Sequence, residues 1–279
     1  MRDFAPVTVR LGGRSAAAGF VGALTGLGGG VIVTPALTLL LGVDLHYAMG
    51  AALVSVIATS SGAAAAYVKE GFSNIRLGVF LEIATTVGAV LGAHLTAVIP
   101  APELATVFAL ALFYSAWHSM RALPAASETT PDPLASRLRL GSSYPGPAGP
   151  ISYQVRRVKA GFALMFSAGL LSGLLGIGSG AMKVIAMDQI MHVPFKVSTT
   201  TSNFMIGVTA AASAGIYLHR GYIDPRLAMP VMLGVLAGSL AGARKLIGAG
   251  TRSLRLVFAT VIGVMAIEMM YSAFTGGFR

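Results

Sequence analysis

Eight long apolar stretches follow one another along the 279-residue chain. A hydrocarbon core about 30 Å thick needs roughly 20 apolar residues for each helical span, and only 11% of the residues here are charged, against roughly 25% in soluble domains. The stretches lack the strict alternation of barrel strands. The sequence therefore predicts an all-α polytopic membrane protein. The predicted segments lie near residues 15–41, 46–68, 77–98, 102–121, 157–191, 196–218, 227–246 and 254–274.

The chain also repeats itself at an offset of 150 residues. Without a gap, "AGFVGALTGLGGG" from Ala18 aligns with "AGLLSGLLGIGSG" from Ala168, and the register holds for about a hundred positions. A register of this length indicates a duplication. We therefore predict a first transmembrane repeat of four segments over residues 1–121, a linker over 122–156, and a second repeat of four segments over 157–279.

The linker and the charges predict which ends of the segments lie in the cytoplasm. The linker contains "SSYPGPAGP" and lacks apolar periodicity, which is typical of a flexible tether. Its basic flanks place it in the cytoplasm. Counting crossings then places the N-terminus and the connections at 69–76 and 220–226 inside, and those at Asp44 and Pro100 outside. The basic connection at 244–255 disagrees, so either the bias is overruled there or one segment does not cross simply.

Clustered glycines stand inside the first and fifth segments, where an unbroken helix would be expected. From Arg14 to Asp44 a helix would be roughly 45 Å long, which is more than one span needs. The helix can therefore break at the glycines, and in lipid an unwound backbone is tolerated only where protein or a wet cavity surrounds it. The two half-helices would begin near Gly30 and Gly180, and their free N–H groups favour anions.

Close helix packing is the alternative role for glycine. We prefer it for the glycines spaced by four, but not for the two clusters, whose glycines are too crowded to share one helix face. The sequence leaves open whether the broken segments cross fully or turn back. The glycines assigned to packing are Gly88, Gly92, Gly234, Gly238 and Gly242.

Polar residues at membrane depth complete the predicted site. Lys183 follows Gly180 by one turn, and a bound anion would offset the cost of burying it, which is about 2.5 to 3.5 kcal/mol on insertion scales; a structural pair with Asp188 or Glu82, or snorkelling, is the alternative. The stretch "KVSTTTSN" offers hydroxyl and amide donors that capping or interhelical bonding could use instead. Glu82 is a candidate for a coupling proton, unless it is ion-paired or interfacial. The predicted substrate contacts are Gly28, Gly29, Gly30, Gly178, Ser179, Gly180, Lys183, Thr200, Thr201, Ser202 and Asn203.

Several function classes are excluded or disfavoured. The chain has no cysteine, which excludes thiolate metal sites and, together with the lack of a buried His/carboxylate cluster, argues against a metal carrier. We predict no cofactor and no metal. "GIGSGA" has no preceding strand, so it is not a dinucleotide motif, and Ser179 has no histidine at membrane depth to activate it as a nucleophile. The net charge of +10 lies mostly between segments, so we predict no nucleic-acid partner.

The paired motifs "GFVGALTGLGGGVIVTPAL" and "GLLSGLLGIGSGAMKVIAM", together with "PFKVSTTTSNFMIGVTAAASAG", resemble the TauE/SafE family of membrane permeases. This resemblance covers both halves of the chain. It implies a bacterial inner-membrane permease that exports sulfite, sulfoacetate or another organosulfonate. The chain departs from the pattern at Ser179, where the family has glycine, and at Ile185, where the first repeat has Pro35, so we expect the second break to differ in shape from the first. The matching family glycines are Gly26, Gly28, Gly29, Gly30, Gly176, Gly178 and Gly180.

The residues and the resemblance together predict a secondary transporter rather than an enzyme. Its substrate would be a small sulfur-containing anion moved by alternating access, with proton coupling through Glu82 as a further hypothesis. The absence of an ATP-binding motif means that a gradient or a partner would drive it. A passive anion channel is the main alternative, followed by a membrane-embedded enzyme. The sequence does not fix the oligomeric state.

Overall fold

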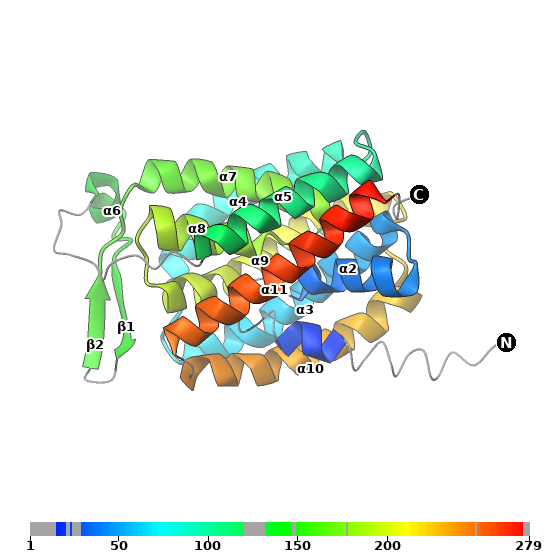
Figure 1. The fold of residues 1–279 in the computed structure, drawn as a ribbon. Helices are drawn as coiled ribbons and strands as arrows, with labels where there is room; N and C mark the ends of the chain where they lie inside the picture. The colour runs from blue at the N-terminus through cyan, green and yellow to red at the C-terminus, as the bar shows by residue number, and fades with distance from the viewer. Residues whose placement is uncertain are drawn as a thin grey trace.

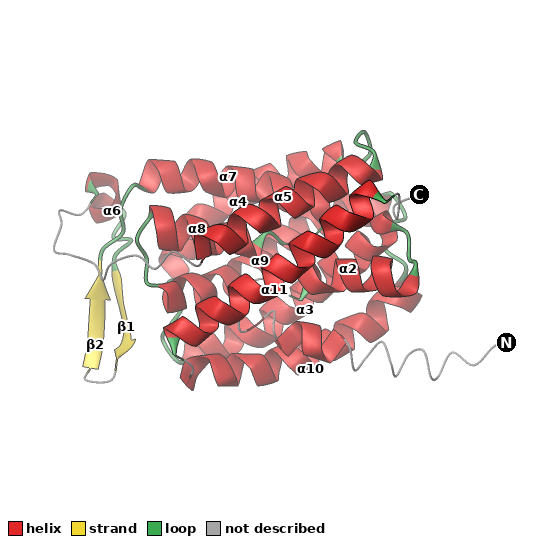
Figure 2. Ribbon diagram, viewed as in Figure 1, coloured by secondary structure: helices red, strands yellow, loops and turns green. Residues whose placement is uncertain are grey.

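The structure is a computed structural model and describes residues 15–20, 23, 29–119, 132–146, 149–176, 178–248 and 250–275. Helices dominate these residues, with one short hairpin at one end of the molecule (Figure 2). The helices α4, α7, α10 and α11 are long and apolar enough to cross a membrane, which confirms the predicted all-α membrane protein. The longer helices are α2 (Gly30–Leu41), α3 (Leu45–Lys69), α4 (Ile75–Leu95), α5 (Ala101–Ser119), α7 (Val158–Leu175), α9 (Phe195–His219), α10 (Pro225–Gly248) and α11 (Thr251–Phe274). The shorter elements are α6 (Pro133–Arg137), β1 (Ser142–Gly146), β2 (Gly149–Tyr153), α8 (Gly180–Ile185) and the π-helical turn Ala186–Ile190, and residues 15–20 and 23 are helical as well.

Helices from the two halves of the chain begin at the same offset as the sequence motifs. Helices α3 and α9 begin and end 150 residues apart, and so do the starts of the pairs α4 and α10, and α5 and α11. Local chemistry sets the matched starts of α4 and α10. The side chain of Asn74 accepts a hydrogen bond from the Leu77 amide, and that of Asp224 accepts one from the Arg226 amide, so each residue satisfies a free N–H group in the first turn.

Matched helices run in opposite directions between two ends of the molecule. We call the end that carries α6, β1 and β2 the linker end, and the other the far end (Figure 1). Helix α9 begins at the linker end, where the Thr200 hydroxyl donates to the carbonyl oxygen of Phe72 in the α3–α4 connection. At the far end, a Cβ on Gly50 of α3 would lie 2.0 Å from the carbonyl oxygen of Tyr222 in the α9–α10 connection. Helix α3 therefore runs towards the linker end, and α9 runs away from it.

The predicted side of two connections has to be corrected. The α9–α10 connection, with Arg220 and Arg226, lies at the far end rather than beside the linker. Helix α10 runs parallel to α3, since Gly62 of α3 packs on Ser239 of α10. The basic α10–α11 connection is therefore at the linker end, as Figure 1 shows, although a simple count of crossings put it on the other side. The prediction for the N-terminus falls on residues 1–14, outside the described part of the chain.

These connections lie at the opposite end from the one predicted because the fifth segment turns back instead of crossing. Helix α7 runs parallel to α4 and away from the linker end, and the chain then returns through α8 and the π-helical turn. The Arg156 amide, just before α7, donates to the Met191 carbonyl oxygen, just after the turn, over 3.0 Å. Residues 157–191 therefore begin and end at the linker end. One of the two options that the sequence left open is thus the correct one: this segment does not cross simply.

Glycines bring the parallel helices close together. A Cβ on Gly88 of α4 would lie 2.3 Å from the carbonyl oxygen of Phe166 in α7, and one on Gly238 of α10 would lie 1.8 Å from that of Ala16. Contacts this close exist only without a side chain. Helix α4 of the first repeat thus packs against α7 of the second repeat, and α10 of the second repeat packs against the helical residues 15–20 of the first. The predicted packing role is confirmed for Gly88, Gly92, Gly238 and Gly242.

The linker is ordered over residues 132–146 and 149–157, so the prediction of a flexible tether is wrong there. The two strands of the hairpin pair antiparallel, with Ser142 opposite Tyr153. Leu140 and Tyr153 are buried in one core with Leu77 of α4, and burial raises the pKa of the Tyr153 phenol to about 12. Asn74 Nδ2 donates to the Leu140 carbonyl oxygen over 2.9 Å and to Tyr153 Oη over 2.8 Å. The linker is therefore part of the fold, docked on the start of α4.

The glycine contacts predict a sharp difference between two glycines in long helices. Gly88→Ala should lower the free energy of unfolding by about 1 to 3 kcal/mol, since the new methyl group must push α7 away. Gly263→Ala in α11, where a Cβ meets nothing within 4 Å, should be neutral or stabilising by up to about 1 kcal/mol. Thermal unfolding of the detergent-solubilised variants measures both. Equal melting temperatures for the two variants would contradict the close crossing.

Docking of the linker predicts slow amide exchange. Residues 140–146 and 149–155 should be protected from hydrogen exchange in the intact protein, as a tether would not be. Asn74→Ala removes the partner of three polar groups, the Leu77 amide, the Leu140 carbonyl and the Tyr153 hydroxyl, and each such loss costs about 1 to 3 kcal/mol. Mass-spectrometric exchange should show faster exchange in the linker and at the start of α4, and unchanged exchange in α11. Rapid exchange of the linker in the wild type would refute the docking.

Candidate functional site

The chain breaks between α7 and α8, where the sequence predicts it. Gly176 ends α7 with a φ of 63°, Gly178 has a φ of 75°, and Ser179 has a φ of 45° immediately before α8 begins at Gly180. These left-handed angles suit glycine and are strained for serine. In the first repeat, α2 begins at Gly30 with Gly29 before it. Gly28 lies outside the described residues.

The second break lies at the middle of the crossing of α3 and α9. A Cβ on Gly178 would meet Val56 of α3 at 2.9 Å and Ile206 of α9 at 3.4 Å. Val56 and Ile206 are 150 residues apart, so they hold equivalent positions in the two repeats. Both are fully buried. The unwound backbone therefore lies where the repeats meet, enclosed by protein as a break in a membrane helix has to be.

The first break reaches the same crossing from the other repeat. The Gly29 amide donates to Thr59 Oγ1 of α3 over 3.2 Å. Asn203 of α9 donates from Nδ2 to the carbonyl oxygen of Ala23 over 3.0 Å. Asn203 thus links the sixth segment to the first through its amide nitrogen. This is the interhelical hydrogen bond that the sequence offered as the alternative to substrate binding. The structure therefore brings Gly29, Gly178 and Asn203 to one region.

The hydroxyl stretch of α9 divides into two groups. Thr200 donates to the Phe72 carbonyl, and Thr201 Oγ1 accepts from the Asn74 amide over 3.0 Å, so both hydroxyls hold the α3–α4 connection. The Ser202 hydroxyl donates to the Gly180 carbonyl over 3.3 Å and fastens α8 to α9. This geometry gives no support to substrate contacts by Thr200 and Thr201. The Ser202 hydroxyl therefore holds the start of α8 in place, and this hydrogen bond gives no support to a substrate contact.

Three buried polar atoms beside the break have no hydrogen-bond partner among the described residues. They are Ser179 Oγ, Thr199 Oγ1 and Asn203 Oδ1. Thr199 and Asn203 are one turn apart on α9, and Asn203 Nδ2 donates to the Thr199 carbonyl oxygen over 3.3 Å. Buried polar groups are almost always paired, so these unpaired hydroxyls are candidate ligand contacts. Two of the three atoms are hydroxyls that can donate to an oxyanion.

Lys183 lies one turn beyond Ser179, since its amide donates to the Ser179 carbonyl oxygen over 3.1 Å. Its side chain is fully buried. Lys183 Nζ donates to Thr209 Oγ1 of α9, and it lies 3.7 Å from Glu82 Oε2 of α4. Thr209 in turn donates to Glu82 Oε1 over 2.5 Å. The structure therefore shows the pair with Glu82 that the sequence offered as an alternative, and Asp188 instead accepts from Gln189.

Sequence reasoning missed Thr209 and gave no separate role to Thr199. The signal for Thr209 was present, because Thr59 and Thr209 are 150 residues apart and both contact a break or the half-helix after it. Two threonines at equivalent positions could have been selected from the alignment alone. Thr199 belongs to the stretch that the sequence singled out, but only the structure shows that its hydroxyl is unpaired.

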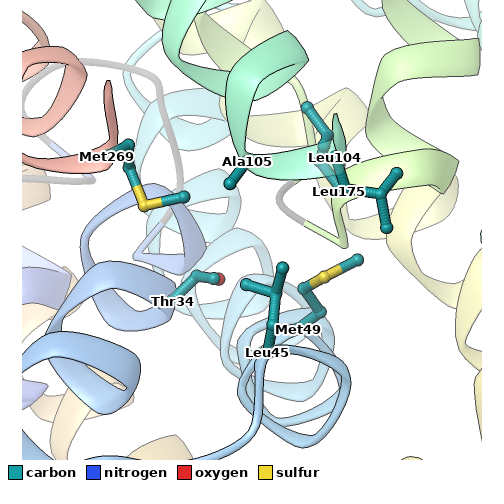
Figure 3. Close-up of a pocket in the computed structure, with 7 residues that line it drawn as sticks. All are labelled: Thr34, Leu45, Met49, Leu104, Ala105, Leu175 and Met269. Carbon is teal, nitrogen blue, oxygen red and sulfur yellow. The ribbon is translucent and has the colours of Figure 1, made fainter. Parts of the chain in front are cut away.

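An apolar crevice lies beside Leu175, the last residue of α7 before the second break (Figure 3). Thr34, Met49 and Leu175 line it together with residues from the start of α5 and the end of α11. Its free space is too narrow to hold a water molecule. Met49 also faces the break, as a Cβ on Gly176 would lie 2.8 Å from Met49 Cβ. Apolar side chains therefore cover the break on the side of Met49. The remaining lining residues are Leu45, Leu104, Ala105 and Met269.

Comparisons with known proteins agree with this arrangement. A probable membrane transporter protein of Bacillus subtilis (strain 168), YunE, is 25% identical over 261 residues, which cover 91% of this chain and 94% of the relative. Another from the same organism, YdhB, is 30% identical over 227 residues, or 81% of this chain and 83% of the relative. A probable membrane transporter protein of Xylella fastidiosa (strain 9a5c) is 24% identical over 268 residues, or 95% and 94%.

No solved structure matches the chain significantly. A family model does match it, over residues 13–269, and its description is Sulfite exporter TauE/SafE. The match includes both breaks, the linker and nearly all of the described helices. The chain therefore belongs to the sulfite exporter TauE/SafE family and is a multi-pass membrane transporter.

Proposed function

We propose that this transporter carries a small sulfur-containing anion, such as sulfite, sulfoacetate or another organosulfonate, by alternating access. The observation that carries the proposal is the buried, unpaired hydroxyl of Ser179, one turn from the buried cation Lys183, with a second unpaired hydroxyl, Thr199, on the neighbouring helix α9. Hydroxyl donors and a cation are what an oxyanion needs once water has been removed from it. The family description supports the sulfur chemistry. The relatives' names give no substrate.

The opposed directions of the matched helices support alternating access. Transporters built from inverted repeats place their substrate between the repeats, beside broken helices, and move one repeat against the other. Here α3 and α9 cross at Val56 and Ile206, with the second break between them. The apolar crevice around Met49 and Leu175, as lined by the described residues, is too narrow for a water molecule, as expected of a carrier that is closed on that side. A passive channel, the main alternative, would need an open path on both sides at once.

We further propose that the linker end faces the cytoplasm of a bacterial inner membrane. The positive-inside bias counts basic residues near the ends of segments, and they gather at the linker end once the fifth segment turns back. The far end has Arg220 and Arg226, and Arg220 donates to the carbonyl oxygens of Ala93 and His94 at the end of α4. Arg220 thus has a structural role at that end. The basic residues at the linker end are Lys69, Arg76, Arg137, Arg139, Arg156, Arg157, Lys159, Lys196, Arg244, Lys245, Arg252 and Arg255.

Binding of anions to the purified protein tests the proposal. Sulfite, sulfate, thiosulfate, sulfoacetate, taurine, methanesulfonate and acetate as the carboxylate control would be compared by thermal shift and calorimetry. At least one sulfonate or sulfite should bind, and Lys183→Ala should abolish its binding. Ser179→Ala should weaken it about 10- to 100-fold, the effect of losing one hydrogen bond to a charged group. Lys159→Ala, an exposed lysine at the start of α7, is the matched control and should bind like the wild type.

Exchange in proteoliposomes then separates a carrier from a channel. A carrier shows saturable flux that is accelerated by the same anion on the opposite side, whereas flux through a channel does not depend on it. If no sulfur-containing anion in the panel binds, or if Lys183→Ala and Lys159→Ala bind equally well, the proposed site is wrong.

A further inference from the structure

We propose that the carried anion and the Glu82 carboxylate compete for Lys183, so that each monovalent anion is carried together with one proton bound to Glu82. The inference rests on the proposed function and adds a second ligand, the proton, to the same site. In this proposal the Glu82 carboxylate forms the ion pair with Lys183 when the substrate is absent. The argument follows from the contacts of the two charges and from the net charge of the site.

Glu82 is held by only one of its two oxygens. Oε1 accepts hydrogen bonds from Thr209 over 2.5 Å and from Thr86 over 3.2 Å. Oε2 accepts none, although it is buried and lies 3.7 Å from Lys183 Nζ. A carboxylate bound to threonine hydroxyls on one oxygen can stay in place when the lysine leaves the other. Oε2 is then the atom that is free to take a proton.

The ammonium group of Lys183 contacts Glu82, and the residue lies one turn from the unpaired Ser179 hydroxyl. It shares α8 with Ser179, one turn away, and contacts Thr209 of α9. Thr199 and Asn203, on the same helix as Thr209, hold the other unpaired atoms. An oxyanion that accepts a hydrogen bond from Ser179 therefore approaches the ammonium group from the side of the break, while Glu82 approaches it from α4.

No other charge among the described residues faces this pair closely enough to replace either partner. Helix α7 packs against α4 through Phe166, Gly169 and Leu170, none of which is titratable. In the π-helical turn, Asp188 accepts a hydrogen bond from Gln189. Of the remaining charges on α9, Lys196 stands over the Phe72 ring at the linker end, and Arg220 bonds the end of α4 at the far end. The net charge of the site is therefore set by Lys183, Glu82 and the ligand.

Charge neutrality then requires a proton. The empty site contains one positive and one negative charge, so its net charge is zero. A monovalent anion that binds beside an ionised Glu82 leaves one uncompensated negative charge in the membrane interior, which is strongly unfavourable. If Glu82 takes a proton from water on the side where the anion enters, and returns it to water on the side where the anion leaves, the loaded site is also neutral. Both forms that cross are then uncharged overall, and transport does not respond to the membrane potential.

The first test counts protons on the wild type with methanesulfonate, a sulfonate that stays a monoanion at every pH used. Calorimetry in two buffers of different ionisation enthalpy should show uptake of about one proton per anion bound, and the affinity should fall about tenfold for each pH unit above neutrality. Binding with no proton uptake overturns the competition and leaves the anion carrier intact. If methanesulfonate does not bind but another anion of the panel does, protons are counted with that anion; failure of every sulfur-containing anion in the panel removes both proposals.

The second test replaces the carboxylate. Glu82→Gln should bind methanesulfonate more tightly than the wild type at neutral pH, without proton uptake and without pH dependence, since the amide does not compete for Lys183. In proteoliposomes this variant should still exchange the anion, but net uptake should follow the membrane potential instead of the pH gradient. Glu103→Gln, an exposed carboxylate at the start of α5, is the matched control and should keep the coupling of the wild type. Proton uptake that persists in Glu82→Gln overturns the proposal.

A neutral double variant guards against loss of folding in Glu82→Gln, where Lys183 is left without its carboxylate. Glu82→Gln with Lys183→Met removes both charges at once, and proteins often tolerate the loss of both partners of a buried ion pair. It should fold, as judged by thermal unfolding, and bind neither methanesulfonate nor a proton. Binding of the anion with wild-type affinity would show that Lys183 is not its partner, and would refute the competition.

Discussion

A backbone inside lipid has to find all its hydrogen bonds within the protein, and the rest of this structure depends on that requirement. The chain leaves the helical conformation between Gly176 and Gly180. Such a break survives only where other elements surround it. Helices α3 and α9, each of 25 residues, cross over the break and enclose it. The glycine contacts of α4 with α7 then let neighbouring helices close around this crossing. The proposed anion site and its supporting bonds are consequences of enclosing an unwound segment.

Turning back at the break also sets the sidedness of the whole second half. Because residues 157–191 begin and end at the linker end, every later helix runs opposite to its partner in the first half. This reversal moves the basic α10–α11 connection to the same end as the linker and the other basic connections. The disagreement that the sequence raised about this connection was therefore evidence for a turned-back segment. Arg220 and Arg226 lie at the opposite end, against the bias, and the carbonyl groups at the end of α4 explain the position of Arg220.

Patterns that depend on one segment could be predicted from the sequence, and arrangements that depend on two could not. The apolar stretches, the break before Gly180 and the packing role of Gly88 follow from local composition and spacing. The order of the linker was missed because Leu140 and Tyr153 are too few to give a periodic pattern, and they are buried against α4 rather than against each other. Thr200 and Thr201 look like any other hydroxyl in the sequence, and only the position of the α3–α4 connection shows what they bind.

Equivalent positions of the two repeats have diverged where the charges lie. Thr59 accepts from the Gly29 amide and donates to the Ser55 carbonyl, whereas Thr209 joins Lys183 to Glu82. Val33 occupies the position equivalent to Lys183, so the ion pair belongs to the second break only. Its partners nevertheless come from both repeats, since Glu82 lies on α4 and the other two residues on α8 and α9. A carrier that moves one repeat against the other therefore changes the contact between these charges in each cycle. The chemistry that would couple the anion to the proton lies on the boundary that has to move.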